Sequence, residues 1–230
     1  MRNSSRTWLD RENAAFAASV SAGSLVLDAG AGMQPYKKHF AHCSYETADF
    51  EMVDKPYAKS TYVCDLASIP VEADRFDAVV FNQVLEHIPE PMVVLRELNR
   101  VMKSGGTIIC TAPFFYEEHE KPYDYFRYTQ FAWRRMLTDA GFSIQSLNWM
   151  EGYFGTLSYQ LQIAARSLPR APAKIAAGLP GWLLAPVFIV LRPSFRLLAT
   201  MFSWLDEQRR FTEAGMPKNY VVIAAKTVSA

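Results

Sequence analysis

Short apolar runs alternate with helical segments over the first 150 residues of this 230-residue chain, and this alternation restricts the fold more than any other feature. The strand-like runs are residues 25–27, 44–50, 62–66, 75–82 and 107–112. The last two are continuously apolar with β-branched residues, as expected for strands buried on both faces. Residues 90–102 and 129–140 carry apolar side chains near a period of 3.6, which predicts helices. The alternation predicts a doubly wound α/β domain around a parallel sheet.

The chain changes character after Met150. Residues 151–218 contain no strand-like run and are rich in Leu, Ala, Pro and aromatic residues. Residues 220–226 then form an apolar run that predicts a final strand. We therefore expect one domain from residues 1–150 and 219–230, with a helical insertion at 151–218 before the last strand. Prolines predict breaks in the insertion at Pro180, Pro186 and Pro193.

The insertion contains an apolar run, residues 179–191, for which the sequence leaves two environments open. With thirteen residues the run is shorter than the roughly 20 that span a bilayer as a helix. Basic residues precede it, and Trp182 and Trp204 bracket the region, which suits a segment that lies on a membrane surface. Packing as a lid or in a homodimer interface would shield the same side chains from water, and we favour this second reading.

Composition indicates the expected partners and location. The 24 Lys and Arg residues nearly balance 23 Asp and Glu, so the net charge of +1 gives no reason to expect nucleic acid as a partner. Cys43, Cys64 and Cys110 lack metal-site spacing, and we expect no metal. No apolar run follows the N-terminal arginine, which argues against a signal peptide. We expect a cytoplasmic protein, located at the inner face of the membrane if the insertion contacts lipid.

A glycine-containing loop follows the first predicted strand. Residues 26–32 read Val-Leu-Asp-Ala-Gly-Ala-Gly, and a helix is expected to open near Pro35. Glycines at the carboxyl end of a first parallel strand let a ligand approach the backbone closely. The third glycine of the dinucleotide pattern G-x-G-x-x-G is absent, and Gln34 and Pro35 occupy its neighbourhood. Because a pyrophosphate needs a bare helix N-terminus there, the sequence disfavours NAD and favours a ligand that lacks phosphate.

Polar residues follow the next predicted strands at the same edge of the sheet. Asp49 ends the second strand, where a carboxylate can accept hydrogen bonds from two ribose hydroxyls. Asp65 ends the third strand, placed for the exocyclic amine of an adenine that Leu66 would cover. Residues 82–87, Asn-Gln-Val-Leu-Glu-His, follow the fourth strand and would line the other end of the same ligand. Each position alone has an ordinary structural explanation, but together they indicate one ligand-binding edge.

The chain resembles the class I S-adenosylmethionine (SAM)-dependent methyltransferases over about residues 24–150 and at the final strand, particularly the type 11 small-molecule group. The resemblance is carried by VLDAGAG, YETADF, CDL, RFDAVVFNQVLEHI, LRELNRVMKSGGTIICTAPF and LTDAGF. It implies a Rossmann-like sheet of seven strands and an enzyme that uses SAM as its cofactor. The cofactor-binding residues that it implies are Asp28, Gly30, Ala31, Gly32, Asp49, Asp65, Leu66, Asn82, Gln83 and Val84.

A polar and aromatic loop follows the fifth predicted strand. Its pattern H-x-x-P-x-D-x-x-R-Y-T, from His119 to Thr129, resembles a methyltransferase subgroup linked to sugar, cell-envelope or secondary-metabolite pathways. The substrate-binding candidates are Tyr123, Asp124, Arg127 and Tyr128. The catalytic candidates are His119, which we slightly favour as the general base, and His87, which otherwise shapes the pocket. In a structural reading of the same loop, Asp124 pairs with Arg127 and Thr129 caps the following helix.

These observations predict a methyltransferase that acts on an oxygen or nitrogen of a small-molecule, glycan or lipid-linked acceptor. The alternative is a non-catalytic protein of the same fold that contacts partners through the insertion. The titratable side chains of the loop at 119–129 favour the enzyme, because a scaffold has no use for them. Methyl transfer needs mainly positioning and exclusion of water, so the prediction does not depend on a catalytic base.

Overall fold

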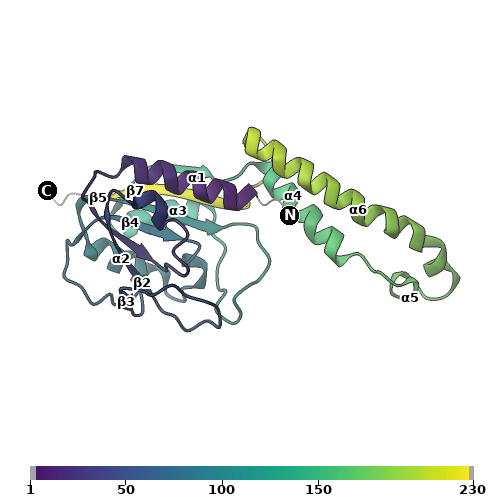
Figure 1. Cartoon of the computed structure of the whole chain (residues 1–230), viewed down its shortest axis with the longest axis horizontal. Coiled ribbons are helices and arrows are strands. Elements are labelled where there is room, and N and C mark those ends of the chain that lie inside the picture. Colours follow the sequence, from purple (N-terminus) through teal and green to yellow (C-terminus); the bar gives the residue numbers. More distant parts are fainter. Residues whose placement is uncertain (1–3, 228–230) are drawn as a thin grey trace. The chain divides into compact units, whose positions relative to one another are not determined.

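The computed structural model describes residues 4–227, which contain a mixed sheet of seven strands (Figure 1). The strands are β1 (Leu25–Ala29), β2 (Ser44–Asp49), β3 (Tyr62–Val63), β4 (Phe76–Asn82), β5 (Met102–Pro113), β6 (Phe142–Trp149) and β7 (Asn219–Lys226). Their order is β3-β2-β1-β4-β5-β7-β6, with β7 antiparallel to both neighbours and the other pairs parallel. The chain reverses its direction of travel across the sheet between β1 and β4. This order confirms the doubly wound, Rossmann-like fold and places a ligand crevice at that reversal.

Helices pack on the sheet through the apolar positions that predicted them. Helix α2 (Pro91–Val101) buries Val94, Leu95, Leu98 and Val101, and α3 (Gln130–Asp139) buries Trp133 and Leu137. Each fully buried aliphatic side chain contributes about 1.5–3 kcal/mol to folding. The Thr129 side chain accepts a hydrogen bond from the Ala132 amide, which confirms the predicted cap of α3. An additional helix, α1 (Ser4–Ser19), precedes the sheet.

The helix expected near Pro35 is replaced by a single 3-10 turn, η1 (Lys37–Phe40). The physical reason lies in the backbone before it. Gly30, Gly32 and Gln34 all have positive φ angles, of 77°, 49° and 54°, and an α-helix cannot include them. The chain therefore turns repeatedly and reaches β2 after one short helical turn. The phosphate-binding helix N-terminus of dinucleotide folds has no counterpart in this described segment.

The described residues group into two compact units. One contains Leu9–Met150 with strand β7, and it holds the whole sheet. The other contains Glu151–Lys218 together with the described residues up to Trp8. In the structure, the start of α1 thus belongs with the helical unit. The domain boundaries expected from the sequence, 1–150 with 219–230 and 151–218, stay a prediction.

The helical unit consists of α4 (Tyr153–Ser167), α5 (Pro172–Ile175) and α6 (Leu179–Gln208), with α4 and α6 packed together. The Ser158 hydroxyl donates to the Ala199 carbonyl at 2.6 Å across this contact. The start of α1 is held by polar contacts within the same unit. Trp8 Nε1 donates to Asp206 Oδ2 at 3.0 Å, and Ser5 Oγ donates to Glu151 Oε1 at 2.6 Å.

Helix α6 runs without interruption through Pro186 and Pro193, so the breaks expected at these prolines were wrong. Each proline leaves the carbonyl four residues earlier without its helical partner. Both prolines are exposed, and water can therefore bond those carbonyls. Pro180 lies in the first turn, where no donor is lost. The apolar run is consequently part of a 30-residue helix that is long and apolar enough to cross a membrane, which corrects the inference from its thirteen residues.

Candidate functional site

The glycine loop after β1 forms the base of the site. Gly30 has a positive φ angle, and a Cβ atom added there would collide with the Val84 side chain. The Gly30 amide donates to the Ala48 carbonyl at 2.8 Å, and the Gly32 amide donates to Asp49 Oδ2, also at 2.8 Å. Glycine is therefore required both by the backbone conformation and by the close approach of Val84. The loop is thereby fixed against the ends of β2 and β4.

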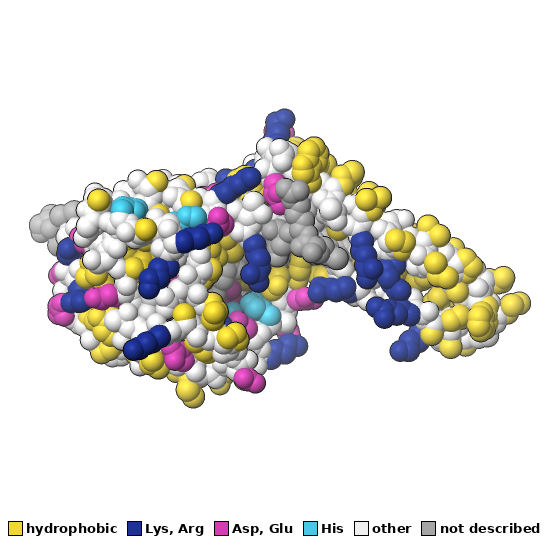
Figure 2. Space-filling model, in the orientation of Figure 1, with side chains coloured by type: hydrophobic (Ala, Val, Ile, Leu, Met, Phe, Trp, Pro, Cys, Tyr) yellow, Lys and Arg dark blue, Asp and Glu magenta, His cyan; other side chains and the backbone are white. Residues whose placement is uncertain are grey.

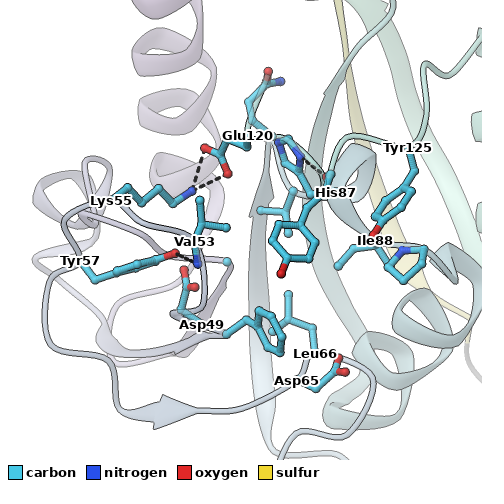
Figure 3. A pocket seen from close by; sticks show the side chains of 16 residues that line it. Asp49, Val53, Lys55, Tyr57, Asp65, Leu66, His87, Ile88, Glu120 and Tyr125 are labelled. Atoms are coloured by element: carbon cyan, nitrogen blue, oxygen red, sulfur yellow. Dashed lines mark hydrogen bonds and ion pairs between the residues drawn. The ribbon is translucent and has the colours of Figure 1, made fainter. Parts of the chain in front are cut away.

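A cavity of about 230 Å³ opens beside this loop (Figure 3). The predicted residues that line it are Gly30, Asp49, Asp65, Leu66, Gln83, Val84, His87 and Tyr123. The predicted residues outside its lining are Asp28, Ala31, Gly32, Asn82, His119, Asp124, Arg127 and Tyr128. The structure thus brings the expected strand ends together around one space and places most of the acceptor loop outside it.

The two strand-end carboxylates form part of the cavity wall (Figure 3). Asp49 Oδ2 accepts the Gly32 amide and Oδ1 accepts the Glu51 amide at 3.1 Å. Asp65 Oδ1 accepts the Ala67 amide at 2.8 Å. These bonds orient both carboxylates and leave acceptor capacity on each for ligand hydroxyls or amines.

Asp28 and Asn82 support the site from behind it. Asp28 is buried and accepts the Tyr45 hydroxyl at 2.7 Å, and its burial raises its pKa to about 7. Asn82 donates to Asn13 Oδ1 at 2.8 Å and accepts the Thr111 hydroxyl at 3.0 Å. These bonds hold the ends of β1 and β4 in place, which is a structural contribution to the cavity.

His87 and His119 lie side by side, but only His87 lines the cavity. The rings pack edge to face with centroids 4.7 Å apart. Nδ1 of His87 lies 2.7 Å from the Tyr123 carbonyl, and because a carbonyl only accepts, that nitrogen carries the proton and Nε2 keeps a lone pair. Burial lowers the pKa of His87, so its neutral form is favoured. Nδ1 of His119 lies 3.3 Å from Asp124 Oδ2.

Glu86 is a buried acid that the sequence analysis did not single out. Its side chain is fully buried, and neither carboxyl oxygen has a hydrogen-bond partner among the described residues. Oε1 lies 3.8 Å from Nε2 of His87. Burial raises the pKa of Glu86 to about 8, so the carboxyl group is largely protonated at pH 7. In the sequence Glu86 belongs to the segment 82–87 that follows the fourth strand, but only the fold shows that its side chain is buried.

Asp124 and Arg127 pair with each other, as the structural reading of the loop proposed. The guanidinium donates to Asp124 Oδ1 at 2.6 Å and to Oδ2 at 2.8 Å. The Arg127 hydrogen bond holds the pKa of Asp124 well below its usual range. Asp124 Oδ2 also accepts the His119 amide at 2.8 Å, and the Tyr128 hydroxyl donates to the Leu85 carbonyl at 3.0 Å. In this structure these groups shape the loop, and their substrate-binding role stays a prediction.

An ion pair at the cavity went unnoticed in the sequence. Lys55 Nζ lies 2.8 Å from both carboxylate oxygens of Glu120 (Figure 3). Lys55 belongs to the β2–β3 connection and Glu120 to the loop between β5 and α3, 65 positions away. Further lining residues missed from sequence are Phe50, Val53, Tyr57, Ile88, Pro89 and Tyr125. They lie in connections without periodicity, so no sequence signal marked them.

The same region holds a set of atoms that could bind a metal ion. Ligand atoms of Glu86, His87 and His119 all lie within 4.8 Å of one another. One carboxylate and two imidazoles form a donor set that suits zinc or iron. Nothing in the geometry requires an ion there, and the expectation of no metal stays a prediction.

The cavity chemistry fits SAM better than a dinucleotide. Carboxylates from Asp49, Asp65 and Glu120 are present, while Lys55, the one Lys or Arg that residues 4–227 contribute to the lining, is paired with Glu120. A lining that is net negative disfavours a pyrophosphate and suits a sulfonium cation with ribose hydroxyls and an adenine amine. Gly30 and the Val84 side chain that packs against it both line the cavity at this point.

Residues 27–110 match the family model described as a methyltransferase domain. Over these residues the sheet-containing unit resembles a methyltransferase domain. The matched residues include the glycine loop, both strand-end acids and the Glu86–His87 segment. The matched region therefore contains most of the cavity wall, while the acceptor loop, which adds Glu120, Tyr123 and Tyr125 to that wall, and the helical unit lie outside the match.

Similar proteins are found both by short sequence matches and by structural comparison. A demethylmenaquinone methyltransferase from Staphylococcus haemolyticus is 41% identical over 46 residues, which is 20% of this chain. The match covers about a fifth of that relative, 19% of its length. Among solved structures, the cyclase SpnF has a TM-score of 0.58 at 18% identity, covering 96% of this chain and 82% of the other.

A second solved structure is the 1,6-didemethyltoxoflavin-N1-methyltransferase of Burkholderia thailandensis, with its substrate and S-adenosylhomocysteine bound. Its TM-score is 0.55 at 16% identity, and the alignment covers 96% of this chain and 81% of that one. At such identities the likeness establishes the shared fold of the methyltransferase domain. The nature of the reaction has to be argued from the site.

Proposed function

We propose that this chain is an enzyme that binds SAM in the cavity beside β1 and β4 and methylates an oxygen or nitrogen of a small acceptor. The observation that carries the proposal is the convergence of Gly30, Asp49 and Asp65 on one cavity whose lining cation is already paired. When bound, SAM supplies a methyl group that its sulfonium has already activated.

The residues of the chain hold and orient the reactants. Asp49 would accept the ribose hydroxyls, and Asp65 would accept the adenine amine with Leu66 against the ring. The loop at Gly30 and the side chain of Val84 would contact the amino-acid portion. Such positioning, together with exclusion of water from the reacting atoms, supplies most of the acceleration that methyl transfer requires.

His87 is placed to take a proton from a hydroxyl acceptor. Its Nδ1–H is directed to the Tyr123 carbonyl, so Nε2 is the nitrogen that can accept. We therefore favour His87 over His119 as the general base, because His87 lines the cavity and His119 does not. His119, which packs against His87 and lies beside Asp124, would act as a positioning residue.

The acceptor side of the cavity suits a small organic molecule. Tyr123, Tyr125, Ile88 and Pro89 supply aromatic and apolar lining there. Relatives named for demethylmenaquinone and for 1,6-didemethyltoxoflavin support a small-molecule acceptor. The loop pattern from His119 to Thr129 resembles a subgroup linked to sugar and cell-envelope pathways, so glycans and lipid-linked compounds are also candidate acceptors. A non-catalytic role in SAM binding is the second candidate, because the fold by itself does not fix the reaction, as a cyclase with this fold illustrates.

Isothermal titration with SAM and with S-adenosylhomocysteine tests the proposal. Asp49→Asn should lower the affinity for each compound by about tenfold or more, since a charge-assisted hydrogen bond contributes about 1.5–3 kcal/mol. Asp54→Asn is the matched control, because Asp54 is exposed on the same connection and lies outside the lining. No heat with either compound would overturn the proposal. Binding without release of S-adenosylhomocysteine across a panel of phenols, sugars and amines would support the non-catalytic candidate.

A further inference from the structure

Helix α6 exposes one continuous apolar side, here called the α6 apolar face. Its residues are Leu179, Leu183, Val187, Val190, Leu197, Met201 and Trp204. Their spacing of three or four residues, with Ser194 bridging the middle, keeps them on one side of the helix over nearly its full length. The opposite side packs within the unit, where Ala199, Ser203 and Asp206 are buried. An exposed apolar face of this length marks a binding surface.

The charge around this face has one sign. Residues 152–205 contain no Asp or Glu, while Arg166, Arg170, Lys174, Arg192 and Arg196 lie among them. Figure 2 shows yellow side chains over α5 and the adjoining end of α6, with a group of dark-blue basic side chains beside them. An apolar face with a basic border and tryptophans at Trp182 and Trp204 is complementary to anionic lipid headgroups above acyl chains.

We propose that the helical unit docks on an anionic lipid bilayer, with α6 in the plane of the surface and its apolar face embedded. Arg166, Arg170, Lys174 and Arg196 contact the headgroups, while Arg192 ties α6 to the end of α4. This inference goes beyond the proposed methyl transfer and does not depend on it, because every residue that carries it lies in the helical unit.

Two other occupants fit the surface less well. A homodimer built on this face would bring together two copies of a segment that has five basic residues and no acid, and like-charge repulsion opposes this. In a transmembrane helix, Arg192 would lie near the middle of the bilayer, where charge is costly. Arg192 instead donates to the Leu168 and Pro169 carbonyls at 2.6 and 3.1 Å, which ties α6 to the end of α4. At the other end of α6, Asp206 and Glu207 are buried and bonded to Trp8 and Thr7.

Flotation of the full chain with lipid vesicles tests the proposal. We expect binding to phosphatidylcholine vesicles that contain phosphatidylglycerol, much weaker binding to pure phosphatidylcholine, and weakening by added salt. Replacing Arg166, Arg170 and Lys174 by Gln should reduce the partition coefficient for the anionic vesicles at least about tenfold. Equal binding of this variant and the unchanged chain would overturn the role of charge.

Apolar contact is tested by the double variant Leu183→Glu and Val190→Glu. These side chains are 68% and 64% exposed, so the fold loses little packing when they change. We expect at least about a tenfold loss of vesicle binding. Phe131→Glu is the matched control, since Phe131 is 73% exposed on α3 in the other unit, and its vesicle binding should be unchanged. Equal loss in both variants would contradict the assignment to α6.

The remaining outcomes separate the other occupants. Chain that stays in the membrane pellet after alkaline carbonate extraction would overturn docking in favour of a span. A chain that fails to float, and whose mass by light scattering falls from dimer to monomer in the double variant, would overturn it in favour of a homodimer. Release by carbonate together with a monomeric mass in solution supports docking.

Discussion

The carboxyl group of Glu86 lies 3.8 Å from Nε2 of His87, inside the fold and beside the proposed SAM cavity. The acid is fully buried with a pKa raised to about 8, whereas burial lowers the pKa of the imidazole. Near pH 7 the pair therefore consists of a neutral acid and a neutral base. The protonated Glu86 carboxyl group can donate a proton, and the neutral His87 imidazole can accept one. Because the two groups are neighbours, the charge that forms on either is not isolated in the protein interior.

Glu86→Gln should remove a pH dependence of stability. The folded pKa of about 8 lies above the ordinary value of 4.5, so between these values the folded chain binds the extra proton. The free energy of unfolding consequently falls as pH rises through this window, by at most about 1.4 kcal/mol per pH unit, and levels off above it. Urea unfolding at a series of pH values should give the variant a shallower decline than the unchanged chain. Superimposable slopes would show that Glu86 is ionised in the fold.

His87→Ala should reduce transfer to a hydroxyl acceptor more than His119→Ala does, while both leave SAM affinity within about threefold. The proton-accepting Nε2 belongs to the ring that lines the cavity, and removal of a general base costs about 10²–10⁴-fold. For the unchanged chain, the His87 resonance followed by NMR should titrate below the ordinary value of 6.5. Release of S-adenosylhomocysteine measures the rates. A larger loss for His119→Ala would return the role of base to His119.

Glu120→Gln should speed the release of SAM with little change in stability. The variant loses the ion pair with Lys55 across two connections that border the cavity. Both side chains are partly exposed, so the pair contributes no more than about 1 kcal/mol to folding. Glu118→Gln is the matched control. Glu118 precedes Glu120 on the same loop, pairs with Lys121 at 3.1 Å and does not line the cavity. Identical rates of SAM dissociation for the two variants, measured by stopped flow, would show that the Lys55–Glu120 ion pair does not slow SAM release.

Tyr45→Phe should destabilise the sheet-containing unit by about 1–3 kcal/mol, because it removes the hydroxyl bonded to the buried Asp28. Loss of that bond also removes a contribution that lowers the pKa of Asp28, so the pKa should rise above its value of about 7. The penalty should accordingly be larger at pH 8 than at pH 5. Denaturant unfolding at both pH values measures it, and a pH-independent penalty would count against this account.

The fold and the cofactor-binding edge were predictable because they depend on local patterns. Strand and helix periods express burial directly, and they placed β1, β2, β4, α2 and α3 to within a few residues, whereas β5 begins at Met102, earlier than the expected residue 107. The carboxyl ends of neighbouring parallel strands share one sheet edge, so Asp49 and Asp65 could be brought together from spacing alone. The antiparallel placement of β7 between β5 and β6 was not predictable, because strand order depends on long-range pairing.

What the sequence by itself determined is the position of most strands and helices along the chain and the chemistry at the strand ends. Only the tertiary structure decided which histidine faces the cavity, that Glu86 is buried, and that Lys55 meets Glu120 from 65 positions away. It also decided that α6 continues through two prolines with its apolar side exposed. The physical reason is that the apolar period of a helix or strand shows which of its own side chains are buried. The partners of a side chain in a connection depend on how distant segments pack, and no local pattern records them.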